Sequence, residues 1–504
     1  MDNSGPEREL NDLAVKALQG LDAARRFVQS RPMPFLGVAG FAVSAVVVAA
    51  GGRVGAARST RALTTWLGLQ DPHGLTAADR LPGGIMLAAV VVLVLLWILA
   101  LEVIRRTRQR VSRVWWLTGA WVMPFALGPP LMDTAVYTHA AFGLIQRAGH
   151  DPYVRAPSSL HDVPIVAAID PGSRGVPSSA GPLGSLLQHL SISVGNGSAL
   201  SAVIILRVAG VLAAIVIGRL AVDMGGSRGG EALAACALNP LVLLYVVSSP
   251  HLDGLMVAVA LGAIASATQR RWVSAMVLAC VAGSITAQGF VLVPILVVAH
   301  VLGRRTMPAW RLVGRDVAIA VVVTAGAGLV QPGGFGWAWT VSKQFAVHTP
   351  FAIASAIGQV LAPVVRGASY DDLAASGRIT AVTAAVCTIV YLVVTVRHRA
   401  LERTVGYSLL ALGLLAPSLY PWYLLWGVLC LAPTAIGTRR VWVVALSAGA
   451  CVLMPGGFSN RAAEGITGVA LGVIALVTAA VLYGVHRRVV LAEKAEPQPV
   501  SAES

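Results

Sequence analysis

The sequence predicts an all-α protein that crosses a lipid bilayer many times. Apolar runs of helix-spanning length, such as residues 87–104 and 465–485, recur along nearly all of the 504 residues. Short arginine clusters follow these runs, as at 105–108 and 487–488. Hydrophobic residues make up 56% of the chain and charged residues only 12%, with a mean hydropathy of +0.74. Ordinary soluble domains carry about 25% charged residues, so this composition indicates a multi-pass membrane protein.

Two further features of the composition narrow the class. The net charge is +15, but the arginines are dispersed over short loops and form no single stripe. They therefore indicate membrane orientation, and we expect no nucleic-acid partner. The five cysteines all fall inside apolar runs without zinc-ligand spacing, so we expect them to be small buried apolar residues. Neither a metal nor a cofactor is expected.

The apolar runs define the expected spans. A span needs about 20 apolar residues, and fewer where protein flanks it. Roughly thirteen to fourteen spans are expected, and the candidate ranges in chain order are 34–51, 83–104, 115–132, 198–221, 232–248, 253–268, 272–286, 288–302, 316–331, 379–396, 405–417, 422–438, 441–454 and 466–485. Segment 351–363 is also apolar, but a span there would move the basic residues 397–399 to the other side. We interpret it as an external or re-entrant helix.

The basic clusters assign the two sides of the membrane. They fall at alternate ends of successive spans, so all of them can be cytoplasmic at once. Tails 1–32 and 486–504 are then cytoplasmic, and 33–485 is one transmembrane domain. Arginine outnumbers lysine 35 to 3, which suggests a GC-rich bacterial genome, so we expect the membrane to be a bacterial plasma membrane. The long polar loop 133–197 lies outside, and polar chemistry concentrates on that side.

The outer loop begins with a predicted helix over 134–147. Tyr137, Ala141, Leu144, Ile145 and Ala148 recur at helical spacing, which is typical of an amphipathic helix lying on the membrane surface. Asp133 stands where it would cap that helix. A turn-rich stretch at 149–153 follows, and a second surface helix is expected over 183–190.

Six short motifs then recur in register across residues 115–431. They are Pro129-Pro130-Leu131 with Val136-Tyr137 and Gly143; Gly149-His150-Asp151-Pro152-Tyr153; Gly181-Pro182-Leu183; Asn239-Pro240-Leu241-Val242; His251-Leu252-Asp253 with Leu255-Met256; and Tyr420-Pro421-Trp422-Tyr423 with Trp426. In this pattern the chain resembles the actinobacterial polyprenol-phosphate-mannose-dependent α-(1→6)-mannosyltransferases of the GT-C class, which build lipomannan and lipoarabinomannan.

The resemblance implies a GT-C-type fold and a reaction. A polyprenyl-phosphate mannose would donate its sugar to a lipid-linked mannan on the extracytoplasmic face, with inversion of the donor's β linkage to an α product. Membrane lipids would be the other partners, and the oligomeric state is left open. The chain departs from the family pattern at Ala135, where an acid usually precedes Val-Tyr, and at Ser179-Ala180, which replaces Pro-Tyr. Thr286 or Gln288 replaces a basic residue.

A carboxylate is expected to take the proton of the acceptor hydroxyl. Asp133 is the candidate base because it stands where a span meets a surface helix; the alternative is a plain helix cap. Asp151 is the alternative base, although a structural turn residue explains it as well.

The donor phosphate calls for cationic or N–H groups. Arg207 lies inside a predicted span, where an arginine is costly, so it either contacts the phosphate or belongs to a buried structural pair. Arg147 and His251 are further phosphate candidates. A solvated loop face explains Arg147 at least as well.

The remaining candidates would bind the acceptor or the sugar. Asp253 could instead cap the sixth span, and the aromatic residues at 420–423 could instead anchor the membrane interface. These candidates are Tyr137, His139, Tyr153, Asp253, Gln288, Tyr420, Trp422 and Tyr423.

Two other functions compete with catalysis. The departures at Ala135, Ala180 and Gln288 fit a catalytically degenerate paralogue that binds polyprenyl lipid or partners active enzymes. A lipid transporter is the other alternative, but the sequence shows no internal inverted repeat and its polar residues gather on one side. That one-sidedness favours a reaction at the membrane surface.

Overall fold

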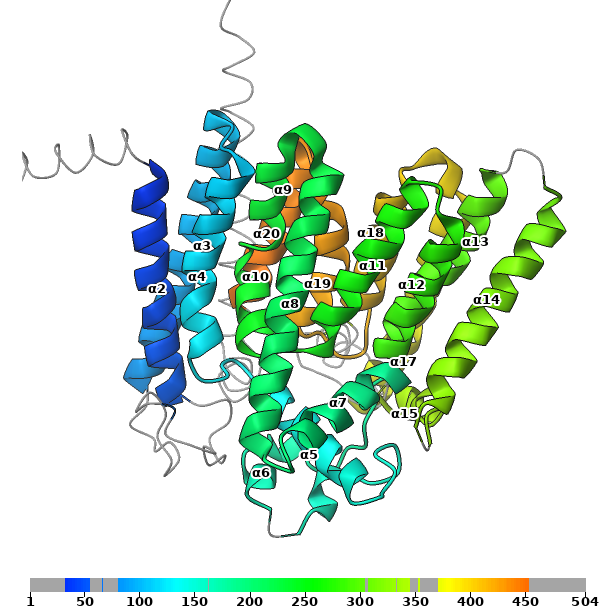
Figure 1. Ribbon diagram of the computed structural model, residues 1–504, viewed down its shortest axis with the longest axis horizontal. Helices are drawn as coiled ribbons and strands as arrows, with labels where there is room; N and C mark the ends of the chain where they lie inside the picture. Colours follow the sequence, from blue (N-terminus) through cyan, green and yellow to red (C-terminus); the bar gives the residue numbers. More distant parts are fainter. Residues whose placement is uncertain are drawn as a thin grey trace, which may run out of the picture.

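The computed structural model describes residues 32–54, 66, 80–161, 163–303, 307–331, 333–344, 352–353 and 370–452. In this part of the chain, long helices run side by side in a bundle and a smaller group of helices lies across one end of it (Figure 1). The expected span 466–485, both expected tails and nearly all of the expected helix 351–363 lie outside the described residues.

The bundle confirms an all-α polytopic membrane protein. Five helices among the described residues are long and apolar enough to cross a bilayer. Each of the first thirteen predicted ranges corresponds to helix. The bundle helices are α2 (Pro32–Val54), α3 (Arg80–Thr107), α4 (Val111–Leu127), α8 (Ala199–Gly225), α9 (Gly229–Cys236), α11 (Leu252–Thr268), α12 (Trp272–Ile285), α13 (Leu292–Leu302), α14 (Ala309–Leu329), α17 (Tyr370–Val394), α18 (Leu401–Leu414), α19 (Pro421–Leu431) and α20 (Thr438–Val452).

The span predicted over 232–248 is not one helix. Helix α9 ends at Cys236, because Pro240 lacks an amide hydrogen and disfavours helix at the residue before it. The Asn239 side chain accepts the amide of Leu241 and starts α10 (Pro240–Val242), which continues as the π-helix η4 (Leu243–Ser248). A sharp bend of 117° then separates η4 from α11.

The arginine-rich turns lie at the end of the bundle opposite the smaller group of helices. Arg440 at the start of α20 contacts Glu231 of α9 at 3.1 Å and the Leu101 carbonyl of α3 at 3.1 Å. Arg270 reaches the Gly303 carbonyl after α13 at 3.5 Å. This is the upper end in Figure 1. The two ends of the bundle therefore differ in charge, as the sequence predicts.

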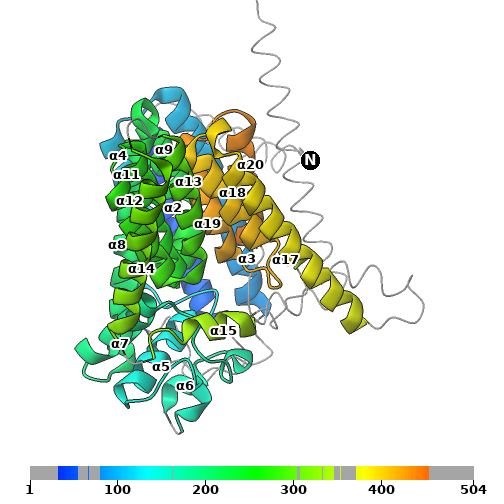
Figure 2. The ribbon, with the colours of Figure 1, turned by 90° about the vertical axis from the view of Figure 1, so that its right-hand side faces the viewer.

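The outer layer consists of α5 (Ala135–Arg147), α6 (Pro164–Ala167), α7 (Pro182–Val194) and α15 (Trp337–Gln344). Both views place these helices across one end of the bundle (Figures 1 and 2). Helix α7 is longer than the predicted 183–190. Helix α5 is not a surface helix with one buried face, because it packs against both α7 and α8 and buries Val136 and Phe142 as well as Tyr137.

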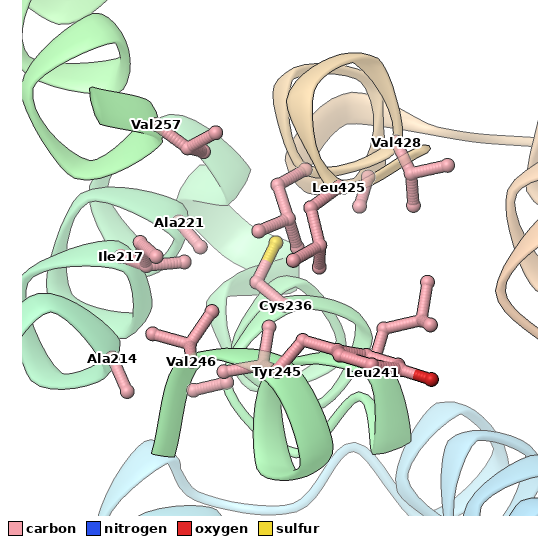
Figure 3. Close-up of a cluster of buried hydrophobic side chains, with 14 of the residues drawn as sticks. Ala214, Ile217, Ala221, Cys236, Leu241, Tyr245, Val246, Val257, Leu425 and Val428 are labelled. Atoms are coloured by element: carbon pink, nitrogen blue, oxygen red, sulfur yellow. The ribbon is translucent and has the colours of Figure 1, made fainter. Parts of the chain in front are cut away.

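The bundle core forms where α8, η4, α11 and α19 meet. Figure 3 shows Cys236 surrounded by apolar side chains from these elements, among them Ile217, Val246 and Leu425. Cys236, Cys280, Cys430 and Cys451 are buried as predicted. Cys387 is exposed on α17, so the expectation of burial was wrong there.

Candidate functional site

Three breaks between helices meet on the side of the bundle that faces the outer layer. Asp133 lies between α4 and α5, His251 lies in the bend between η4 and α11, and Tyr420 directly precedes α19. Backbone at such breaks is not confined to a helical ladder, so it can present side chains toward a common point. We call the cluster of Asp133, His251 and Asp253 the carboxylate–histidine centre.

Asp133 accepts three hydrogen bonds. Its Oδ1 atom accepts the backbone N–H of Ala135 at 2.7 Å and the hydroxyl of Ser249 at 2.8 Å. Its Oδ2 atom lies 2.6 Å from Nε2 of His251. Thr134, and not Asp133, is the N-cap residue of α5, but Asp133 still accepts the amide of the first helical residue and also faces the neighbouring bend.

His251 and Asp253 extend the centre toward α19. Burial alone would lower the pKa of His251, but the charge and hydrogen bond of Asp133 and the charge of Asp253 together raise that pKa. His251 Nδ1 lies 4.0 Å from Oδ2 of Asp253. The other Asp253 oxygen accepts the indole N–H of Trp426 at 2.7 Å. His251 therefore lies between two carboxylates and favours its protonated form.

Aromatic rings cover one side of His251. The Trp422 ring stacks on the imidazole at a centroid distance of 4.1 Å, and Tyr420 stacks on Trp422 at 4.5 Å. Tyr423 packs against Trp426 at 4.5 Å. These rings face the centre. Both predicted roles of these rings, a wall for a sugar or lipid and an anchor at the membrane interface, stay predictions.

His139 and Tyr137 approach the centre from α5. His139 Nδ1 lies 2.8 Å from the Gln188 amide nitrogen of α7. Burial and, to a smaller extent, the nearby charge of His251 lower the pKa of His139 to about 3, against the opposing effect of Asp133. His139 is therefore neutral at physiological pH and accepts the Gln188 N–H. Tyr137 is buried on the same helix and interacts electrostatically with Arg207.

Arg207 braces two helix ends. Its guanidinium donates to the Gly128 and Ala126 carbonyls at the end of α4 and to the Ser248 carbonyl, at 2.7 Å, at the end of η4. Carbonyls at helix C-termini carry partial negative charge, which suits a buried cation. The Trp66 ring also lies 5.2 Å from the guanidinium carbon. This pattern favours the structural interpretation of Arg207, and phosphate contact stays a prediction.

Several predicted site residues lie elsewhere. Arg147 stands at the far end of α5, about 20 Å along the helix from Asp133, and ties Ile192 and Asn196 to that end. Asp151 accepts the Tyr153 backbone N–H at 2.8 Å and acts as the turn residue of the 149–153 stretch. Gln288 is half-buried in η5 (Ala287–Val291), which packs mainly on α12.

Sequence reasoning missed three polar partners. Ser249 and Gln188 had no pattern of their own, although Ser249 lies in the outer turn that also carries His251. Trp426 belongs to a quoted motif, but its bond to Asp253 joins positions 173 residues apart. Only the folded chain brings these partners together.

The chain matches known protein families over most of its length. Residues 37–302 match the family described as alpha-(1->6)-mannopyranosyltransferase, N-terminal domain, and residues 348–484 match the MptB C-terminal domain. Alpha-(1->6)-mannopyranosyltransferase A of Mycobacterium tuberculosis is 27% identical over 439 residues, which is 81% of each chain. Alpha-(1->6)-mannopyranosyltransferase B of Corynebacterium glutamicum is 25% identical over 402 residues, covering 70% of this chain and 65% of the relative. No solved structure matches this chain.

Proposed function

Since this chain belongs to the alpha-(1->6)-mannopyranosyltransferase family, we propose that it is a membrane mannosyltransferase with its reaction site at the carboxylate–histidine centre. The observation that carries the proposal is the 2.6 Å contact between Asp133 and His251, residues 118 positions apart in the chain. At this contact a carboxylate lies next to a histidine and to aromatic rings, at the edge of the membrane bundle. Together these side chains provide a proton acceptor and a positive charge, which glycosyl transfer requires.

The donor we propose is a polyprenyl-phosphate mannose. The centre lies where membrane-embedded helices α11 and α19 meet the outer layer, so a sugar carried on a membrane lipid can approach it along the bundle. The acceptor we propose is a lipid-linked mannan, which could contact the outer layer from the membrane surface. Both substrates would thus be held by the membrane.

The proposed reaction is a single displacement. The acceptor hydroxyl oxygen attacks C1 of the donor mannose from the side opposite the phosphate, and Asp133 takes the hydroxyl proton. As the new C1–O bond forms, the bond from C1 to the phosphate oxygen breaks, and polyprenyl phosphate leaves with the bonding electron pair. Inversion at C1 converts the donor's β linkage to an α product.

The neighbours of Asp133 suit this role. The hydrogen bonds from Ala135, Ser249 and His251 hold the carboxyl group in one orientation. The protonated imidazole of His251 adds a positive charge close to the departing phosphate, where negative charge develops. Arg207 acts as a positioning residue, because it holds the chain just before Asp133 and just before Ser249.

The orientation we propose places this centre on the extracytoplasmic face. The opposite end of the bundle carries the arginine-rich turns, and cytoplasmic loops carry an excess of Lys and Arg. Both termini would then be cytoplasmic. The long loop 133–197 would face the cell envelope, where the proposed mannan acceptor could reach it.

Replacing Asp133 by asparagine tests the base. The amide oxygen of Asp133→Asn can still accept the Ala135 and Ser249 hydrogen bonds, but the amide cannot take a proton. We expect transfer from polyprenyl-phosphomannose to a short α-mannoside to fall about 10²–10⁴-fold in purified membranes. The matched comparison is Asp151→Asn, which should retain transfer because Asp151 serves a turn.

Other results would redirect the proposal. Full turnover by Asp133→Asn would remove Asp133 from the mechanism, and loss of transfer only in Asp151→Asn would move the base to Asp151. If the wild-type protein binds polyprenyl-phosphomannose but never transfers mannose, the chain is a lipid-binding paralogue instead of an enzyme.

A further inference from the structure

A pocket opens at the arginine-rich end of the bundle, opposite the outer layer. It lies between the end of α3, the helix α9, the short helix η7 (Ala432–Thr434) and the start of α20. Its volume is about 360 Å³ when the open solvent at its mouth is included. None of its lining residues belongs to the carboxylate–histidine centre. We call it the basic pocket.

The lining of the basic pocket has an apolar part and a charged part. Leu101 of α3, Ala232 of α9 and Val443 of α20 belong to the apolar part and are buried. The charged part consists of Arg228, Glu231 and Arg440. It reaches solvent, since the side chains of Glu231 and Arg440 are each 23% exposed. Such a lining suits a ligand in which a charged group is joined to an apolar part.

Positive charge exceeds negative charge at the basic pocket. Arg440 pairs with Glu231 at 3.1 Å. Arg228 ends the turn η3 (Gly226–Arg228) and has no carboxylate partner within the described part of the chain. The charges of Arg105, Arg228 and Glu102 also act on Arg440. Three guanidinium groups thus lie within electrostatic range of two carboxylates, and this excess favours an anionic ligand.

An exposed tryptophan indicates how deep in the membrane the basic pocket lies. Trp442 follows Arg440 by two residues on α20 and is 61% exposed. Exposed tryptophans at helix ends concentrate where lipid headgroups meet water, because the ring is apolar and its N–H is polar. Val443 and Val444 continue the pocket lining from that level along α20. A free anion would need only the arginines, whereas the apolar lining favours an anion carried on acyl chains.

We propose that the basic pocket binds the phosphate headgroup of an anionic membrane phospholipid, with Arg228 and Arg440 donating hydrogen bonds to the phosphate oxygens. A guanidinium group has five N–H donors. Arg440 directs one nitrogen to Glu231 and another to the Leu101 carbonyl, so N–H donors remain for a phosphate. Basic pockets between membrane helices recognise anionic headgroups in this way. The site lies at the end opposite Asp133 and does not depend on the reaction proposed there.

The test measures how much phospholipid binds to the purified full-length protein in a non-ionic detergent, by native mass spectrometry. The anionic phosphatidylglycerol should bind about tenfold more tightly than the zwitterionic phosphatidylcholine, because two arginines favour the net negative charge. Inorganic phosphate at the same concentration should not displace phosphatidylglycerol. Equal binding of the two phospholipids would overturn the inference, and displacement by inorganic phosphate would assign the pocket to a free anion instead of a lipid.

Two substitutions in the pocket should change binding in opposite directions. Arg228→Gln removes a donor and should weaken phosphatidylglycerol binding about three- to tenfold. It should leave the unfolding temperature of the lipid-free protein unchanged, because Arg228 has no carboxylate partner among the described residues. Glu231→Gln removes the carboxylate that competes for Arg440, so it should strengthen binding while lowering the lipid-free unfolding temperature. Purely structural arginines would give no gain in binding with Glu231→Gln.

Arg271→Gln is the matched control. Arg271 directly precedes α12 at the same arginine-rich end and is exposed, but it does not line the basic pocket. This variant should bind phosphatidylglycerol as the wild type does. Unchanged binding in Arg228→Gln would overturn the inference. An equal loss of binding in Arg228→Gln and Arg271→Gln would also overturn it, because the lipid would then respond to the general positive charge of this end.

Discussion

At the scale of single residues, two histidines near Asp133 favour opposite protonation states. His251 lies between Asp133 and Asp253, whose charges raise its pKa. His139 is half-buried, and burial together with the charge of His251 lowers its pKa to about 3. The positive charge of His251 thus disfavours a second positive charge on His139. The centre therefore carries one cation and one neutral acceptor, the latter bound to Gln188.

The neutral state of His139 predicts a pH-dependent stability. Histidine in an unfolded chain titrates near 6.5, whereas folded His139 titrates near 3. Between these values the unfolded state binds more protons, so this contribution is complete above 6.5 and is lost as the pH falls. Thermal unfolding at pH 7.5 and pH 5.0 should show a smaller acid loss in His139→Gln than in the wild type. Equal losses would contradict the assignment.

His251 contributes with the opposite sign. Because its folded pKa is raised, its stabilisation is complete below 6.5 and is lost as the pH rises through the folded value. Thermal unfolding measured from neutral to alkaline pH should therefore show a smaller loss of stability in His251→Gln than in the wild type.

The sequence predicts site residues one at a time and leaves their pairing open. Asp133, His251 and Trp422 could be chosen because each stands at an expected span boundary. The Asp133–His251 contact could not, since the two residues are 118 positions apart. Arg207 shows the same limit. Its position inside a predicted span indicates an unusual environment, but only the fold shows that backbone carbonyls accept hydrogen bonds from its guanidinium.

At the scale of helices, close backbone approach fixes the outer layer. A β-carbon on Gly143 of α5 would lie 2.3 Å from the Gln188 carbonyl oxygen of α7. Gly181 lets the start of α7 meet the end of α12, where its amide donates to the Ile285 carbonyl at 2.9 Å and Ala180 forms a β-bridge with Thr286. Two of the quoted motifs are thus explained by packing.

Gly143→Ala should therefore destabilise the protein by about 1–3 kcal/mol through overpacking of α5 on α7. The matched control is Gly119→Ala in α4, where a β-carbon meets nothing within 4 Å. That change should instead stabilise by about 0.5–1 kcal/mol, because alanine restricts the unfolded chain. The unfolding temperatures of the two variants are measured in the same detergent. Equal shifts would show that the contact between α5 and α7 tolerates an added β-carbon.

Helix positions follow from the sequence better than helix breaks do. Apolar composition continues through Asn239 and Pro240, so the run 232–248 reads as one span although the proline ends its helix. The predicted exposed face of α5 also failed, because hydropathy cannot show that α7 and α8 cover it.

At the scale of the whole molecule, the bundle has one basic end and one end that carries the carboxylate–histidine centre. Val154 in the outer layer is 74% exposed, and Gln269 after α11 is exposed at the basic end. In intact cells, Val154→Cys should react with a membrane-impermeant maleimide, and Gln269→Cys should react only after permeabilisation. The wild type already contains the exposed Cys387, so its labelling gives the background to be subtracted. The reverse pattern would place the centre in the cytoplasm.

The bond between Trp426 and Asp253 has a consequence for biosynthesis. Ribosomes deliver the amino-terminal part of a chain first, so Asp133, His251 and Asp253 enter the membrane well before α19 is made. A nascent chain that stops before residue 420 has both carboxylates and the imidazole but lacks the rings that cover them. The carboxylate–histidine centre is therefore completed late, once insertion is almost finished.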